Sequence, residues 1–182
     1  MLIKNTTQNY GIVAILFHWI MAILIIGMLA LGLYMTGLPK SLEKFQLIGW
    51  HKEYGILILM LAVLRVAWRL SNLLPSLTTL PTWERLAARL THFLLYVAMF
   101  IMPLTGWMMS SAAGYSVSFF GLFTLPDLIG TNKDLAHTIS EIHEYTAYAL
   151  IALIILHVLA ALKHYWIDKD NIMQRMLSSR SN

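Results

Sequence analysis

Four long apolar stretches, separated by charged segments, constrain the fold of this chain more than any other feature. The first runs from Gly11 to Met35, and His18 is its only ionisable side chain. The others run from about 50 to 68, from about 90 to 113 and from 145 to 162. A helix needs roughly 20 apolar residues to cross a bilayer, and the second stretch qualifies if its charged side chains extend to the interface. The sequence therefore predicts four membrane-spanning helices.

The composition agrees with a membrane protein of one domain. Of 182 residues, 58% are hydrophobic and 12% are charged, whereas a soluble domain has about 25% charged residues. We expect an all-α, integral membrane four-helix bundle in which residues 1–182 form a single domain. The helices are predicted at approximately 11–36, 50–69, 88–113 and 141–166. The first is interpreted as a retained helix, because it is too long for the apolar part of a signal peptide.

The distribution of basic residues predicts the orientation of the bundle. Cytoplasmic loops carry an excess of lysine and arginine, so the net charge of +4 indicates orientation and not nucleic-acid binding. One side would carry Lys4, Arg65, Arg69, Arg85, Arg89, Lys163, Lys169, Arg175 and Arg180, and the other Lys40, Lys44, Lys52 and Lys133. Both termini are therefore predicted to be cytoplasmic. The longest loop, about 114 to 137, then lies outside, and its aromatic residues suggest that it folds back on the bundle.

Histidines within the apolar stretches are the candidate functional residues, because an ionisable side chain inside a membrane is costly. A single isolated histidine is as often a neutral residue hydrogen-bonded to a carbonyl as it is a functional residue. The functional interpretation therefore rests on the whole set of histidines. His143 and His157 are 14 residues apart, which is about 21 Å along a helix and four turns of a left-handed bundle. Both would face the interior at different depths, which suits two haems stacked along the bundle axis. The chain has no cysteine, so any haem would be held non-covalently.

Each haem needs a second axial ligand at a matching depth. His18 lies about 10 Å and His157 about 9 Å from the inner ends of their stretches, which predicts an inner pair. His51 and His143 both lie just beyond the outer ends of theirs, which predicts an outer pair. His92 lies near the depth of His18, so it either replaces His18 as the ligand or has a supporting role; we favour His18.

Further polar residues have two interpretations each. Arg65 and Arg69 either neutralise haem propionates or mark the cytoplasmic end of a helix. His164 is either an interfacial polar residue or a hydrogen-bond donor to a quinone carbonyl. Gly49 and Gly55 flank His51 and would allow a macrocycle to approach closely, although small residues are equally typical of ordinary membrane helix interfaces.

The ordered set of histidines resembles the bacterial cytochrome b561 family over residues 10–175. The resemblance lies in Phe17-His18-Trp19, Gly49-Trp50-His51, Leu90-Thr91-His92, Ile142-His143-Glu144, Leu156-His157-Val158, His164-Tyr165-Trp166 and Lys169-Asp170-Asn171. It implies a multi-pass protein of the bacterial inner membrane with two b-type haems. Carried over by position, it implies haem ligation by His18, His51, His143 and His157, and a quinone contact at His164. His92 matches a family histidine without an assigned role.

The resemblance also implies an activity, because a member of that family is a superoxide oxidase that passes electrons to ubiquinone. The alternative is a haem-carrying anchor subunit that links a hydrogenase or dehydrogenase to the quinone pool. A third possibility is a haem-free bundle that transports protons or ions through its histidines. Superoxide is an anion, and Lys40, Lys44, Lys52 and Lys133 are the candidates for steering it. Six acidic residues on the same side oppose them.

Overall fold

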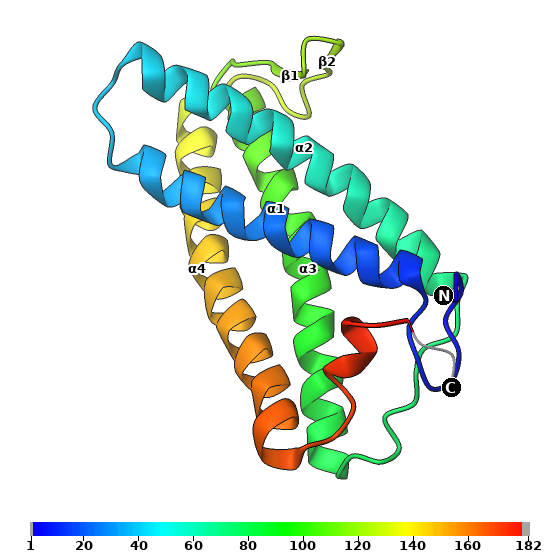
Figure 1. The fold of residues 1–182 in the computed structure, drawn as a ribbon. Helices are drawn as coiled ribbons and strands as arrows, with labels where there is room; N and C mark the ends of the chain where they lie inside the picture. Colours follow the sequence, from blue (N-terminus) through cyan, green and yellow to red (C-terminus); the bar gives the residue numbers. More distant parts are fainter. Residues whose placement is uncertain (1, 180–182) are drawn as a thin grey trace.

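The computed structural model describes residues 2–179 and consists mainly of four long helices (Figure 1). They are α1 (Ile12–Thr36), α2 (Leu42–Leu70), α3 (Thr82–Ala112) and α4 (Lys133–Lys163). A π-helix, η1 (His164–Asp168), continues α4, and a short 3-10 helix, η2 (Gln174–Met176), follows it. All four long helices are apolar and long enough to cross a membrane. The prediction of a helical four-helix membrane bundle is confirmed.

Three helices begin earlier than the apolar stretches indicate. The predicted starts at 50, 88 and 141 are too late, because α2 begins at Leu42, α3 at Thr82 and α4 at Lys133. Two of these starts have a side-chain cap: Ser41 at α2 and Asn132 at α4 accept from the backbone N–H groups of Lys44 and Leu135. The start of α3 follows Pro81, which provides no side-chain cap. A capped polar turn extends a helix beyond the bilayer, and hydropathy alone does not detect it.

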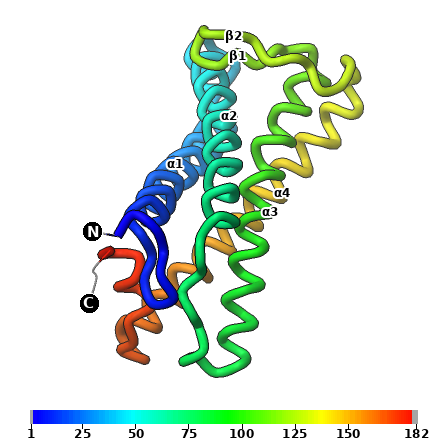
Figure 2. Tube along the Cα trace, turned by 90° about the vertical axis from the view of Figure 1, so that its right-hand side faces the viewer, coloured from blue at the N-terminus to red at the C-terminus, as the bar shows by residue number. Residues whose placement is uncertain are grey.

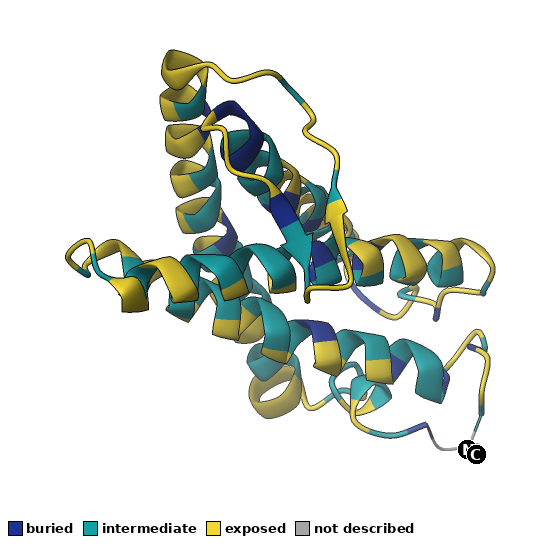
Figure 3. Ribbon diagram, turned by 90° about the horizontal axis from the view of Figure 1, so that it is seen from above, coloured by how far each residue is buried: buried dark blue, intermediate teal, exposed yellow. Residues whose placement is uncertain are grey.

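The four helices pack mainly as neighbours in sequence: α1 with α2, α2 with α3 and α3 with α4. A buried cluster of Met21, Ile58, Ala62 and Met99 joins α1, α2 and α3. No buried residue of α4 belongs to this cluster within the described chain. The outward faces of the helices are largely exposed (Figure 3). The exposed residues include many large apolar side chains, as expected for contact with lipid.

A two-stranded hairpin covers one end of the bundle, which we call the outer end (Figure 2). Strands β1 (Val117–Phe119) and β2 (Phe123–Leu125) are antiparallel. Phe120 packs edge-on against Tyr54 of α2 with ring centroids 5.2 Å apart, and Lys52 Nζ donates to the Ser116 carbonyl at 3.0 Å. The loop therefore folds back on the bundle as expected. It is shorter than predicted, because its last residues form the first turn of α4.

The described ends of the chain meet at the opposite, inner end of the bundle (Figure 1). The Asn5 side chain donates to the Leu73 carbonyl at 2.9 Å, which ties the N-terminal segment to the connection between α2 and α3. The indole of Trp19 donates to the Met176 carbonyl at 2.8 Å, which holds η2 against α1. The described ends of the chain, residues 2 and 179, thus lie on one side of the bundle. Arg180, one of the predicted inner basic residues, lies outside the described residues.

Candidate functional site

Two histidines from different helices face each other in the outer half of the bundle. The ring centroids of His51 on α2 and His143 on α4 are 6.4 Å apart. Two imidazoles on opposite sides of one metal ion have centres roughly 6 Å apart, because each metal–nitrogen bond is about 2 Å long. The spacing of this outer pair suits a single shared ion. Both residues lie well inside their helices, since α2 begins at Leu42 and α4 at Lys133.

The hydroxyl of Thr105 defines which nitrogen of His143 is free. Thr105 Oγ1 lies 2.9 Å from His143 Nδ1, and it also contacts the carbonyl oxygens of Ile101 at 2.7 Å and Met102 at 3.0 Å. A hydroxyl has one hydrogen and carbonyls only accept, so the hydroxyl donates to its own helix and accepts from Nδ1–H. The Nε2 lone pair of His143 is then available for a metal. Metal-binding histidines commonly donate their other N–H in this way.

Glycines on neighbouring helices provide space for both outer rings. A Cβ atom on Gly32 of α1 would lie 3.3 Å from His51 Cε1, and one on Gly106 of α3 would lie 3.3 Å from His143 Cε1. By contrast, a Cβ on Gly49 or Gly55 would meet nothing within 4 Å. The glycines adjacent to His51 in sequence are therefore not the ones that accommodate its ring.

Three histidines gather in the inner half of the bundle. The His157 ring centroid on α4 lies 6.1 Å from that of His18 on α1 and 5.5 Å from that of His92 on α3. The inner group thus contains the predicted pair and also the alternative ligand, at comparable distances from His157. It lies about 21 Å along α4 from the outer pair, since His143 and His157 are separated by 14 residues.

Two arginines of α2 lie beside the inner group. Arg65 Nη2 is 3.3 Å from His18 Nδ1, and both Arg65 and Arg69 stack on the ring of Tyr96 at 5.5 and 5.2 Å. A guanidinium only donates, so His18 Nδ1 accepts and the ring hydrogen resides on Nε2. Coordination through Nε2 needs that hydrogen on Nδ1. If His18 served as a ligand through Nε2, its Nδ1 would carry the hydrogen and could no longer accept from Arg65. Arg65 would then donate to another acceptor.

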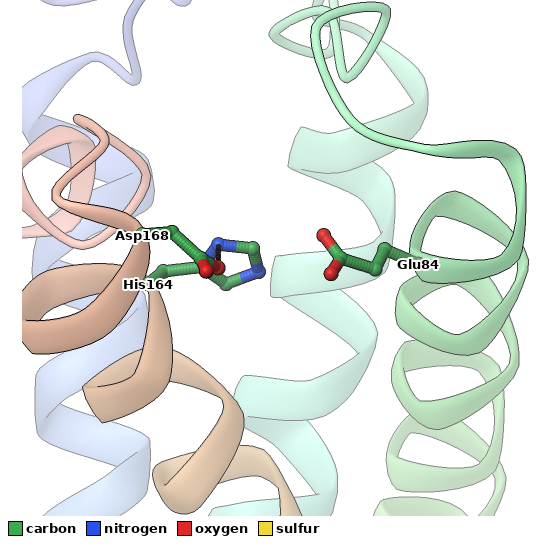
Figure 4. Close-up of side chains that lie close together, drawn as sticks. All are labelled: Glu84, His164 and Asp168. Carbon is green, nitrogen blue, oxygen red and sulfur yellow. Dashed lines mark ion pairs between the residues drawn. The ribbon is translucent and has the colours of Figure 1, made fainter.

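His164 lies at the inner end, where α4 passes into η1. Its Nδ1 contacts Asp170 Oδ2 at 2.7 Å and Asp168 Oδ2 at 3.1 Å. Glu84 of α3 faces this group from across the bundle (Figure 4). The three acidic partners were not predicted, because they come from the polar turns outside the apolar stretches.

The four outer lysines do not form one cluster of free charges. Lys44 donates to the Leu38 carbonyl at 2.7 Å, and Lys52 donates to Ser110 Oγ at 3.3 Å as well as to the hairpin. Both are half-buried, whereas Lys40 and Lys133 are exposed. Lys52 adjoins His51 in sequence, so it is the outer lysine with the closest link to a candidate ligand.

Four helices long and apolar enough to cross a membrane, with facing histidines at two depths, are the arrangement expected of a membrane-embedded cytochrome. The family model described as prokaryotic cytochrome b561 matches residues 9–179. The chain is 36% identical to Cytochrome b561 homolog 2 of Escherichia coli (strain K12), over 98% of this chain and 96% of that protein. It is 33% identical to Cytochrome b561 homolog 1 of the same organism, over 90% and 93% of the two chains. It is 29% identical to a Yersinia pestis protein named "Probable superoxide oxidase CybB", over 95% and 98%.

The chain therefore belongs to the prokaryotic cytochrome b561 family. It is a membrane protein of electron transfer in a family that carries b-type haem.

The side chains around the histidines fit a haem. His51 Nδ1 is buried without a hydrogen-bond partner, and the contact with Thr105 leaves His143 Nε2 free to ligate. Two arginines near the inner group can neutralise carboxylates. The absence of cysteine from the chain leaves non-covalent binding as the mode of attachment.

Proposed function

We propose that the chain holds two b-type haems, one between His51 and His143 and one between His18 and His157. The observation that carries this proposal is the pair of ring spacings, 6.4 and 6.1 Å, at opposite ends of α4. His92 supports the inner site from α3 as a hydrogen-bond partner of the bound group. Arg65 and Arg69 pair with its propionates.

The proposed reaction is oxidation of superoxide with reduction of a membrane quinone. Two superoxide anions each lose one electron and leave as two molecules of O₂; the quinone takes up two electrons and two protons and leaves as quinol. Bound haem supplies the one-electron chemistry between the two substrates. Two histidine ligands would leave the bound iron no open position, which would favour electron transfer over oxygen binding. The 29% identity to a protein named as a superoxide oxidase supports the choice of donor.

The residues divide the reaction between the two ends. Lys52, with Lys40, Lys44 and Lys133, attracts superoxide to the outer end, which faces the periplasm. His164 at the inner end hydrogen-bonds a carbonyl of ubiquinone. Both termini are cytoplasmic, and the chain lies in the bacterial inner membrane. No protein partner is required for this reaction.

A visible spectrum tests this function. Purified, oxidised protein receives a pulse of superoxide, with or without a ubiquinone. We expect reduced b-type haem bands to appear rapidly and to disappear only when quinone is present. If superoxide leaves the haem oxidised, the donor is wrong, and the role of an anchor subunit for a hydrogenase or dehydrogenase replaces it.

A further inference from the structure

The backbone around His164 is shaped so that two acidic side chains reach one imidazole ring. His164–Asp168 forms a π-helical turn, and Lys169 then adopts the left-handed conformation with φ 54°. The backbone N–H groups of Lys169 and Asp170 both return to the His164 carbonyl. Wide turns of this kind are common at functional sites, and a left-handed non-glycine residue is strained. The strained residue Lys169 thus lies between Asp168 and Asp170, the two residues whose side chains meet His164.

The contacts define the state of the His164 ring. Carboxylates only accept hydrogen bonds, so Nδ1 carries the hydrogen that points to Asp170 Oδ2 at 2.7 Å and Asp168 Oδ2 at 3.1 Å. Asp170 is itself held by the backbone N–H of Ile172, which donates to its Oδ1 at 3.0 Å. The side chain of His164 is only 13% exposed. Nε2 is therefore the nitrogen left for a proton that can be passed to a substrate.

A lysine connects this group to α3. Lys163 Nζ lies 2.7 Å from Asp168 Oδ2 and 2.8 Å from Glu84 Oε1. Glu84, His164 and Asp168 each offer one possible metal-ligand atom, and these three atoms lie within 4.8 Å of one another (Figure 4). A metal ion is a poor occupant here, because the ammonium of Lys163 already bridges the two carboxylates. The cluster contains three carboxylates, those of Glu84, Asp168 and Asp170, and one ammonium, so its net charge is negative when the His164 ring is neutral.

We propose that Glu84, Lys163, Asp168 and Asp170 form the proton-delivery network for quinone reduction, with His164 as the residue that hands over the proton. This inference rests on the proposed reduction of quinone at His164. The quinone gains two electrons and two protons; each proton leaves His164 Nε2 for a quinone oxygen, and inner-side water replaces it through the carboxylates. Asp170 is a positioning residue that stabilises the protonated ring. Glu84 lies across from the ring on another helix and relays the replacement proton.

The test isolates the half-reaction with quinone. Full-length, haem-loaded protein is reduced with dithionite, mixed with excess ubiquinone-1, and followed by the decay of its reduced bands. We expect Asp170→Asn to slow this reoxidation about 10-fold or more at saturating quinone, and Asp170→Glu to recover part of the rate. Glu84→Gln should also slow it. Glu141→Gln removes a carboxylate at the other end of α4 and should leave the rate unchanged.

A second measurement separates proton delivery from quinone binding. Affinity for ubiquinone-1 is determined from the quenching of tryptophan fluorescence and should be the same in Asp170→Asn and wild type. A variant that reoxidises slowly only because it binds quinone weakly would overturn the proposal. So would Asp170→Asn and Glu84→Gln variants that react as fast as Glu141→Gln. If Asp170→Asn loses its haem, the reoxidation rate of Glu84→Gln tests the proposal on its own.

The proposed function fails in a different way. If wild-type protein reduced by dithionite is not reoxidised by quinone, the acceptor itself is wrong, and this is seen before any variant is compared. If wild type reacts and the network variants match it, only the proton-delivery inference is wrong.

Discussion

At the scale of single residues, Thr105 is the clearest support for a ligand role of His143. Its hydroxyl donates within α3 and accepts from His143 Nδ1 at 2.9 Å. We predict that Thr105→Val, which keeps the shape but removes the acceptor, weakens haem binding at the outer pair about 10-fold or more. Retention of haem is measured as the haem-to-protein ratio by pyridine haemochrome during extended dialysis against apomyoglobin.

Thr146→Val is the matched control for this change. Thr146 lies on α4 and its hydroxyl donates to the Ile142 carbonyl of its own helix at 2.7 Å. It should lose no haem. If Thr105→Val retains haem as well as Thr146→Val does, Thr105 has no part in haem binding.

His18 and His92 compete for one role, and single substitutions separate them. Both approach His157, at 6.1 and 5.5 Å between ring centroids. We predict that His18→Ala purifies with one haem per chain and that His92→Ala keeps two, with a shifted reduction potential for the inner haem. The haem-to-protein ratio and a redox titration measure the two effects. The reverse result would assign the ligand to His92.

At the scale of whole helices, the outer histidines depend on close approach between helix surfaces. Gly32 of α1 is the contact for the His51 ring, and an added Cβ would lie 3.3 Å from it. Overpacking costs about 1–3 kcal/mol, so we predict that Gly32→Ala binds the outer haem roughly 5-fold or more weakly.

Gly27→Ala is the control on the same helix, because nothing lies within 4 Å of its added Cβ. Alanine also favours a helix by about 1 kcal/mol over glycine, so this control should be at least as stable as wild type. Haem retention is measured for both variants. If Gly32→Ala keeps its haem as well as Gly27→Ala, the tight contact has no functional consequence.

The helices and the histidine set could be predicted from the sequence because lipid imposes a length and histidines in apolar stretches are conspicuous. The helix starts could not, because polar turns capped by Ser41 and Asn132 carry no hydropathy signal. Gly32 was missed for a different reason: it contacts His51 across a helix interface, and sequence proximity pointed to Gly49 instead. Asp168 and Asp170 reach His164 only through a π-helical turn, which has no simple sequence pattern.

At the scale of the whole molecule, the charge distribution is the basis of the proposed orientation, and that orientation decides which proposed substrate would meet which end. The inner end carries the larger set of basic residues, and both described ends of the chain lie there. The outer end has four lysines and six acidic residues, so in the proposed reaction superoxide would rely on local charges such as that of Lys52 and not on the overall field.

This orientation is testable because the chain has no cysteine of its own. We predict that Leu122→Cys, at a position 76% exposed between β1 and β2, reacts with a membrane-impermeant maleimide in cells whose outer membrane has been made permeable. Thr79→Cys, in the exposed connection between α2 and α3 at the inner end, should react only after the inner membrane is disrupted. The opposite pattern would place the hairpin and Lys52 in the cytoplasm, away from periplasmic superoxide. It would place His164 and its acidic partners at the periplasmic face, so protons for quinone reduction would come from that side.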